Sequence, residues 1–324
     1  MAPRTGLSRS ALIALRDCLL LKPDESVLIL TDPTCHRIGM ALLKAARKIG
    51  AYAVYTEMPA MERNGQEPPP ALAELMKGFP AVVAATSKSL THTDARREAC
   101  RAGARVATMP GILEETMVRC LAADYYAIAE RTERVTRLLN AGHRVRVTTA
   151  AGTDLAFSIE GVNAISSTGL IHQPGAFGNL PSGESYMRPL EGTAAGVVVV
   201  DGSMAGVGNL LAMGETIQIA VNAGVATTIT GREAARKLDG LLRAVSPDAY
   251  TVAEFGVGTN DAAQIIGNIL EDEKVMGTIH IAFGNNVSMG GTVNVPIHLD
   301  GIIQSPTVEL DGRLLMDNGR LLLD

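Results

Sequence analysis

Short apolar runs alternate with helical segments through the first 110 residues of the chain. The run SVLILTD (26–32) precedes the helical stretch TCHRIGMALLKAARKIG (34–50), and the run AYAVYTEMP (51–59) follows it. The pattern recurs as PAVVAATS, THTDARREACRAG and ARVATMPG. Strand, helix and strand joined by short links are typical of parallel βαβ units. We therefore predict that residues 1–135 form a doubly wound α/β domain with a mostly parallel sheet.

Several partner classes are disfavoured by motifs and charge. The turn after the first run, DPTCHRIG (32–39), has neither the GxGxxG glycines nor the lysine of a nucleotide site. A net charge of −5 without a basic run argues against nucleic acid as the main partner. No apolar stretch approaches membrane-spanning length, and the four cysteines lack CxxC spacing. We expect a cytoplasmic protein with free thiols and no membrane contact.

From about residue 141 the sequence changes to alternating strands and tight turns. HRVRVTTAAGTDLAFSIEG (143–161) and ETIQIAVNAGVATTIT (215–230) predict hairpins, and GREAARKLDGLLRA (231–244) predicts one clear helix. The dipeptides Asp311-Gly312 and Asn318-Gly319 predict further hairpin turns. A chain of 324 residues favours two domains, with a junction in the polar helical stretch 131–140. Residues 136–324 are predicted to form a β-rich α+β domain that binds metal.

Two polar residues near the end of the chain share one face of a predicted strand. In TVNVPIHLDGII (292–303), alternation directs Leu299 and the valines to one face, and His298 and Asp300 to the other. An imidazole and a carboxylate in this spacing suit metal ligation. A polar strand face in contact with water is the alternative interpretation.

Three further residues extend this candidate cluster. His280, in GTIHIAFGNN (277–286), lies on the strand face that carries small residues; a core histidine bonded to the backbone is the alternative. Glu254 lies in the apolar run AYTVAEFGVGTN (249–260), where a buried carboxylate must be paired, protonated or bound to metal. Glu184, in GNLPSGESYMRP (178–189), has by its spacing the features of a solvated loop residue.

At these residues the chain resembles the thermophilic metallo-aminopeptidases of the aminopeptidase T and aminopeptidase S type, a leucyl aminopeptidase-like family. Five blocks occur in the family's order: GNLPSGE, EGTAAGVVVVDGS, AEFGVGTN, DEKVMGTIHIAFGNN and HLDGIIQSPTVELDG. The resemblance implies a homodimer with two metal ions in each carboxy-terminal domain, and Glu184 or Glu254 as the general base. Val287 stands near the place of a tyrosine ligand in the peptidases. The implied metal ligands are Glu184, Glu254, His280, His298 and Asp300.

This ligand set suits Zn²⁺, Co²⁺ or Mn²⁺ better than Ca²⁺, which seeks only oxygen. Two such ions about 3.5–4 Å apart can activate a bridging water for attack on an amide. We therefore expect a metal-dependent hydrolase, a metalloprotease that removes amino-terminal residues from peptides or cleaves a small amide. The metal-bound water would be the nucleophile.

Two other functions stay open. An iron-dependent ring-opening dioxygenase of the dihydroxypyridine type, which is similar to this family, would use His280, His298 and Asp300. The two retained glutamates favour hydrolysis, whereas the absence of the tyrosine favours the oxygenase. The third possibility is a metal-binding protein without catalytic activity.

Other polar residues give weaker indications. His92 could either cap the helix that follows it or face a cleft. Cys35 and His36 lack an orienting group and are interpreted as structural. Nothing in the spacing of Glu191 places it at the site.

Overall fold

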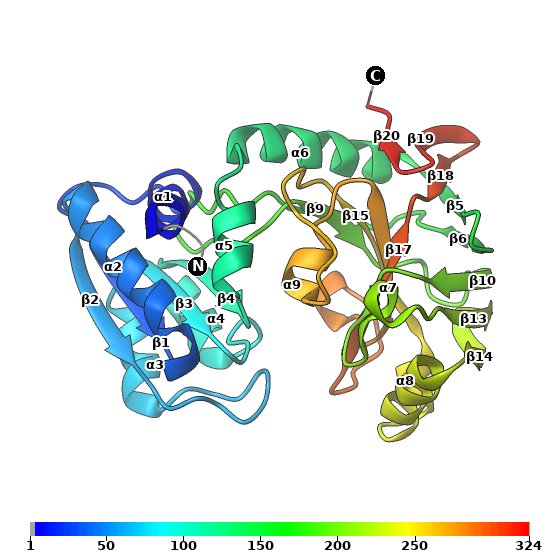
Figure 1. Cartoon of the computed structure of the whole chain (residues 1–324), viewed down its shortest axis with the longest axis horizontal. Helices are drawn as coiled ribbons and strands as arrows, with labels where there is room; N and C mark the ends of the chain where they lie inside the picture. The colour runs from blue at the N-terminus through cyan, green and yellow to red at the C-terminus, as the bar shows by residue number, and fades with distance from the viewer. Residues whose placement is uncertain (1–3, 324) are drawn as a thin grey trace. The chain divides into compact units, whose positions relative to one another are not determined.

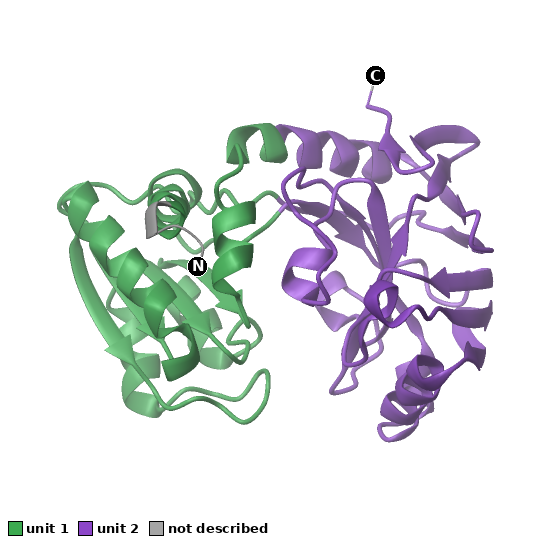
Figure 2. Ribbon diagram, in the orientation of Figure 1, with its two compact units in different colours: residues 1–129, 168–182 green, residues 130–167, 183–324 purple. Residues whose placement is uncertain are grey.

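The computed structural model describes residues 4–323, which form two compact units (Figure 2). Residues 1–3 and 324, which belong to the expected domain ranges, lie outside the described residues. The first unit comprises the chain up to Ala129 together with Thr168–Ser182, and the second comprises Glu130–Ser167 and the chain from Gly183. The expected boundary after residue 135 falls inside helix α6 (Tyr125–Ala141). The two expected domains were continuous ranges, whereas the chain returns to the first unit at Thr168–Ser182.

The first unit is the predicted α/β domain. Its sheet has the strand order β2-β1-β3-β4-β8, and each described pairing is parallel. Figure 1 labels β1, β2, β3 and β4 of this sheet. β3 is buried along its whole length, as expected for a parallel sheet covered by helices. The strands are β1 (Ser26–Thr31), β2 (Tyr52–Glu57), β3 (Ala81–Thr86), β4 (Arg105–Pro110) and β8 (Phe177–Asn179). The helices are α1 (Arg4–Ile13), α2 (His36–Ile49), α3 (Pro70–Lys77), α4 (Asp94–Arg101) and α5 (Glu114–Cys120), and α6 begins at Tyr125.

Asp32 lies at the carboxyl ends of β1 and β3, where α/β sheets commonly bind ligands. One carboxylate oxygen accepts hydrogen bonds from the backbone N–H groups of Thr34 and Cys35, at 3.1 and 3.2 Å. The other accepts from the backbone N–H and the hydroxyl of Ser87, at 2.6 and 2.5 Å. The donors that could hold a phosphate at this edge are therefore bound to a side chain of the protein itself.

The second unit is the predicted β-rich domain and contains two antiparallel sheets. One has the order β14-β13-β10-β6-β5-β18-β19-β20, and the other has the order β12-β11-β17-β16-β15-β9-β7. The eight strands of the first are β5 (Arg144–Thr148), β6 (Asp154–Ser158), β10 (Ala195–Val200), β13 (Ile217–Asn222), β14 (Val225–Gly231), β18 (Thr307–Leu310), β19 (Arg313–Asp317) and β20 (Arg320–Leu321). The seven of the second are β7 (Ile165–Ser167), β9 (Glu184–Met187), β11 (Ser203–Met204), β12 (Gly208–Asn209), β15 (Val252–Gly258), β16 (Thr278–Gly284) and β17 (His298–Gln304).

The apolar faces of these two sheets share one core with helix α8 (Glu233–Arg243), which forms where the sequence predicted a helix. The rings of Phe157 in β6 and Phe255 in β15 are 5.2 Å apart in this core. Short helices α7 (Leu210–Met213) and α9 (Ile269–Asp272) lie in the connections. Within residues 4–323, no helix combines the length and the apolar character needed to cross a lipid bilayer.

The predicted hairpins also form. β5 pairs with β6, and β13 pairs with β14. The turn residues Asp311 and Gly312 have φ angles of 51° and 79°, as a tight hairpin turn requires. The φ angles of Asn318 and Gly319 are 45° and 80°, so these residues form a second tight turn of the same kind.

Candidate metal centre

The polar residues singled out in the sequence gather on one face of the seven-stranded sheet. In the antiparallel register, Gly256 of β15 lies beside His280 of β16. Alternate residues, such as Phe255 and Ile281, point into the core on the other face. The five predicted ligands that come together are Glu184 (β9), Glu254 (β15), His280 (β16), His298 and Asp300 (β17).

Glu254 lies between the two imidazoles. Its Oε1 is 3.1 Å from Nε2 of His280, and its Oε2 is 3.2 Å from Nε2 of His298. Nε2 of His298 is also 3.2 Å from Oδ1 of Asp300, while Nε2 of His280 is 3.7 Å from Oε2 of Glu184. The donor atoms form two overlapping groups, each within 4.8 Å: Glu184, Glu254 and His280; and Glu254, His298 and Asp300.

Three buried polar atoms of this cluster make no hydrogen bond. They are Nδ1 of His280, Oε2 of Glu184 and Oδ1 of Asp300. Buried polar atoms are nearly always paired, so carboxylate oxygens without a hydrogen bond beside the Nε2 atoms of two imidazoles indicate a place for a cation. Imidazole and carboxylate together suit a divalent first-row metal. The residues present therefore fit a metal ion, and their individual roles as ligands stay a prediction.

His298 is oriented from outside the cluster. Its Nδ1–H donates to the backbone carbonyl of Asn285, 2.7 Å away, which leaves Nε2 to face Glu254 and Asp300. Metal-binding histidines are commonly fixed in this way through their second nitrogen. The His298 side chain is 31% exposed, whereas that of His280 is 0% exposed. The cluster is therefore open on the side of His298.

Gly256 forms the floor beneath His280. A Cβ atom at Gly256 would lie 2.0 Å from Nε2 of His280, which is shorter than any real contact. The imidazole can occupy this place only because the neighbouring strand has no side chain there. The small residues that the sequence shows on this face thus make room for the ring.

The charges of the cluster shift the pKa values of both histidines upward in the metal-free protein. Burial lowers the pKa of His280, but the hydrogen bond with Glu254 and the charges of Glu184 and Asp300 outweigh it and raise the pKa to about 9. Burial of His298 is likewise outweighed by Asp300 and Glu254, so its pKa is raised. Burial raises the pKa of Glu254, but its hydrogen bonds with the two imidazoles outweigh that effect and lower it.

Three charged or polar residues at this face were missed in the sequence. Lys274 is buried, with its Nζ 2.8 Å from Oε1 of Glu184 and also bonded to Glu273. Burial opposes the charge of Lys274, but these two carboxylates outweigh it and raise its pKa. Tyr186 follows Glu184 by two residues. Its pKa is raised, mainly by burial and to a lesser extent by the charges of Glu184, Glu254 and Glu273. Strand alternation from Glu184 could have identified Tyr186; no local pattern indicates that Lys274 reaches Glu184.

The segment 285–297 between β16 and β17 differs from the prediction. A strand was expected from residue 292, but β17 begins only at His298, because the preceding residues fold into a compact loop. Glu191 binds this loop: its Oε1 accepts from Nδ2 of Asn286 and from the N–H of Thr292, at 2.9 and 2.7 Å, and its Oε2 accepts from the Thr292 hydroxyl at 2.7 Å. Val287, near the expected tyrosine position, is 47% exposed in this loop.

The other histidines lie outside the cluster. His36 bonds to Glu57, with Nδ1 2.7 Å from Oε2. His172 bonds to the backbone carbonyl of Asp17 at 2.7 Å. His92 is exposed in a turn, and the following residue, Thr93, caps helix α4.

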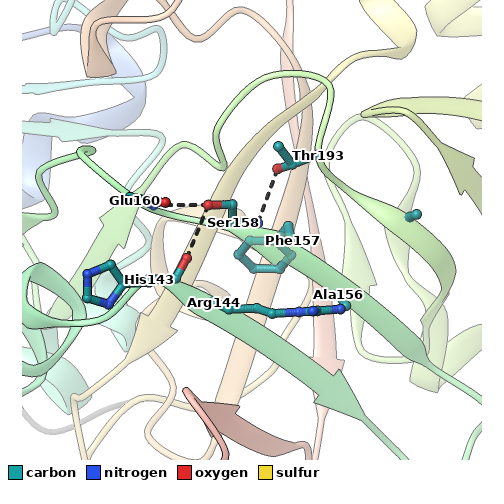
Figure 3. A pocket seen from close by; sticks show the side chains of 8 residues that line it. His143, Arg144, Ala156, Phe157, Ser158, Glu160 and Thr193 are labelled. Atoms are coloured by element: carbon teal, nitrogen blue, oxygen red, sulfur yellow. Dashed lines mark hydrogen bonds between the residues drawn. The ribbon is translucent and has the colours of Figure 1, made fainter.

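His143 lines a separate surface pocket of about 400 Å³ on β5 and β6 (Figure 3). The Ser158 hydroxyl bonds there to the carbonyl of His143 and to the N–H of Glu160, each at 3.2 Å. None of the five predicted ligands lines this pocket. The candidate metal centre is thus a different place in the second unit.

Comparison with known proteins assigns the family. Residues 12–323 match the model of the NicX family, described as 2,5-dihydroxypyridine 5,6-dioxygenase. A curated 2,5-dihydroxypyridine 5,6-dioxygenase from Pseudomonas putida strain KT2440 is 25% identical over 194 residues, or 55% of this chain. The matched part covers 54% of that relative, about half of its length.

Two solved structures share the fold over almost the whole chain. The 2,5-dihydroxypyridine dioxygenase from Pseudomonas putida KT2440 has a TM-score of 0.86 at 20% identity and covers 99% of this chain and 98% of its own. Wild-type AmpT from Thermus thermophilus has a TM-score of 0.69 at 19% identity, with coverages of 98% and 99%. At these identities, both likenesses concern the fold.

The expected peptidase function is therefore wrong. The resemblance to aminopeptidase T holds for the fold, but the family match and the curated relative are both dioxygenases. Terms such as hydrolase, metalloprotease and aminopeptidase conflict with the family match. The fold is similar to both solved structures and so does not by itself distinguish a peptidase from a dioxygenase. The chain belongs to an enzyme family, that of the 2,5-dihydroxypyridine 5,6-dioxygenases (NicX).

Proposed function

We propose that this protein is an iron-dependent dioxygenase that opens the ring of 2,5-dihydroxypyridine or a closely related dihydroxylated pyridine. The observation that carries the proposal is that Glu254 joins His280 to the pair His298 and Asp300 on one sheet face, in two overlapping groups of donor atoms, in a chain of the NicX family. Two histidines and one carboxylate are typical ligands of non-haem ferrous oxygenases. His280, His298 and Asp300 would hold the iron. Ferrous iron bound there would supply the activation of dioxygen.

The overall reaction balances without another reductant. The bond between two ring carbons breaks, and each of these carbons gains one oxygen atom from the same dioxygen molecule. The four electrons that reduce dioxygen come from the ring. This accounts for a site that needs an organic substrate and dioxygen but no further cofactor.

The surrounding residues have separate tasks. Glu254 faces both imidazoles and is the carboxylate that would accept a proton from a substrate hydroxyl. Lys274 forms a buried ion pair with Glu184, with Nζ 2.8 Å from Oε1, and so holds that carboxylate in place. Because His298 is the partly exposed ligand, substrate and dioxygen would enter on its side, while the buried His280 side keeps water out.

Oxygen uptake by the iron-loaded protein tests the proposal. Protein prepared without metal should consume dioxygen with 2,5-dihydroxypyridine only after Fe²⁺ is added, and ¹⁸O₂ should place two labelled atoms in the product. His280→Ala, His298→Ala and Asp300→Ala should lose iron and activity, whereas the exposed His143→Ala should retain both. Iron-loaded protein that binds the metal but consumes no dioxygen with any dihydroxypyridine contradicts this function. The homodimer stays a prediction, which sedimentation of the purified protein tests.

A further inference from the structure

Arg188 continues a strand that lines the candidate metal centre. In β9, Glu184 and Tyr186 face the cluster, whereas Ser185 bonds to Thr136 and Met187 is buried in the core. Arg188 is the first residue after β9, and alternation continued from the strand would put its side chain on the side of Glu184 and Tyr186.

The strand register also places Arg188 near the predicted ligands. Met187, the last residue of β9, pairs with Phe255 of β15, and Glu254 precedes Phe255 in the chain. Because the strands are antiparallel, Arg188 and Glu254 lie at the same end of this strand pair.

The guanidinium of Arg188 is half-buried and poorly paired. Its Nε is buried without any hydrogen bond, and its Nη1 donates only to the carbonyl of Pro189, at 3.3 Å. Within residues 4–323, no carboxylate oxygen lies within 4.0 Å of it. By contrast, the buried Arg105 has Glu25 at 2.7 Å. An arginine that loses water without gaining a partner is destabilising, which suggests that its partner is a ligand.

The carboxylate of Glu191 senses the charge of Arg188 but forms no ion pair with it. The pKa of Glu191 is lowered, chiefly by the hydrogen bond from the Thr292 backbone and less by the charge of Arg188. Both of its oxygens are occupied by the three hydrogen bonds from Asn286 and Thr292. Glu191 is thus held by the loop 285–297, and the Nε–H of Arg188 stays without an acceptor.

We propose that Arg188 is a specificity residue that binds a carboxylate group on the ring of the substrate. A guanidinium presents two parallel N–H donors that match a carboxylate, a geometry that a lysine cannot offer. The inference rests on the proposed function for the identity of the ring, but not for the existence of the anion-binding position. The substrate class it names is a dihydroxypyridine carboxylate rather than the uncharged ring.

Binding without turnover tests the proposal. Zn²⁺-loaded protein is titrated calorimetrically with 2,5-dihydroxypyridine, with its 3-carboxylate and 4-carboxylate, and with nicotinate, which has the carboxylate but no hydroxyl. We expect at least one carboxylated dihydroxypyridine to bind about ten- to a hundredfold more tightly than the uncharged ring. Arg188→Gln should abolish this preference and weaken nicotinate by a similar factor, while changing the affinity for 2,5-dihydroxypyridine less than about twofold. Arg188→Lys should restore only part of it.

Controls separate recognition from folding and from the proposed reaction. Arg236→Gln, on the exposed side of α8, should leave every affinity unchanged, and all variants should keep wild-type metal content and melting temperature. An unchanged carboxylate preference in Arg188→Gln, or no preference in the wild type, overturns the inference. If nicotinate binding depends on Arg188 but no dihydroxypyridine is oxidised, the proposed reaction fails and the anion position stands. If ring opening occurs but nicotinate binding does not depend on Arg188, the proposed reaction stands and the anion-binding position fails.

Discussion

The imidazole of His298 donates its Nδ1 proton to the backbone carbonyl of Asn285 over 2.7 Å. This bond fixes the tautomer and leaves Nε2 facing the cluster. Asn285 begins the loop 285–297, and Glu191 fastens that loop through Asn286 and Thr292. The orientation of a predicted metal ligand therefore depends on a carboxylate outside the cluster.

Replacing Glu191 should loosen this loop. Glu191→Ala removes three hydrogen bonds and takes the acceptor from the Nδ2 donor of the buried Asn286, which we expect to cost about 1–3 kcal/mol of unfolding free energy. Amide hydrogen exchange should rise in residues 285–297, and metal affinity should fall because His298 is less well held. Glu160→Ala, at an exposed position, is the matched control. Unchanged exchange in the loop would show that Glu191 does not hold it.

Gly256 should tolerate no side chain. Gly256→Ala would put a Cβ atom 2.0 Å from Nε2 of His280, so the ring must move, at about 1–3 kcal/mol or more, with loss of bound metal. Gly240→Ala is the control, because nothing lies within 4 Å of the added atom in helix α8. That substitution should stabilise by about 0.5–1 kcal/mol. Urea denaturation and metal analysis of both variants test the pair; equal stabilities would contradict the packing argument.

How far the sequence predicts this protein depends on how local each signal is. Strand alternation correctly placed His280 on the small-residue face and His298 beside Asp300, because a period of two is a property of the strand alone. The contact of Lys274 with Glu184 joins residues that are far apart in the chain, and no periodic pattern encodes it. For the same reason, β8, which returns from residues 177–179 to the first sheet, was missed.

The function was mispredicted for a chemical reason. Imidazoles and carboxylates serve both a hydrolytic metal pair and a single ferrous ion, so the residue types do not fix the reaction. What distinguishes the two is the number of ions and the charge around them. Here Lys274 places a buried positive charge 2.8 Å from Glu184, a feature that spacing did not reveal.

Lys274 should be essential for the stability of this face. Lys274→Met leaves the buried Glu184 and the partly buried Glu273 without their common partner, which we expect to cost about 3–5 kcal/mol. The double variant Lys274→Met with Glu184→Gln should recover part of that loss, since one charge is removed. Lys77→Met, which breaks a surface pair with Glu74, should cost less than about 1 kcal/mol. Denaturation curves decide; a double variant no more stable than the single one would refute the charge argument.

The metal-free protein should lose stability as the pH rises above neutrality. The pKa of His280 is raised from 6.5 to about 9, so the folded state holds this proton more tightly than the unfolded state. Its contribution is complete below pH 6.5 and disappears as the pH rises through about 9, a change on the order of 3 kcal/mol. The lowered pKa of Glu254 reflects the same ion pairs with the two imidazoles. Strong acid would break these pairs by protonating the Glu254 carboxylate.

Metal should reverse this trend, because a metal ion binds the neutral imidazole and competes with the proton. Urea denaturation across this pH window, with and without saturating Zn²⁺, measures both slopes. Glu254→Gln should flatten the metal-free profile, since it removes the carboxylate that stabilises both imidazolium groups, whereas His143→Ala should leave the slope between pH 6.5 and about 9 unchanged. A metal-free wild type whose stability is constant across that window would rule out a protonated His280 beside Glu254.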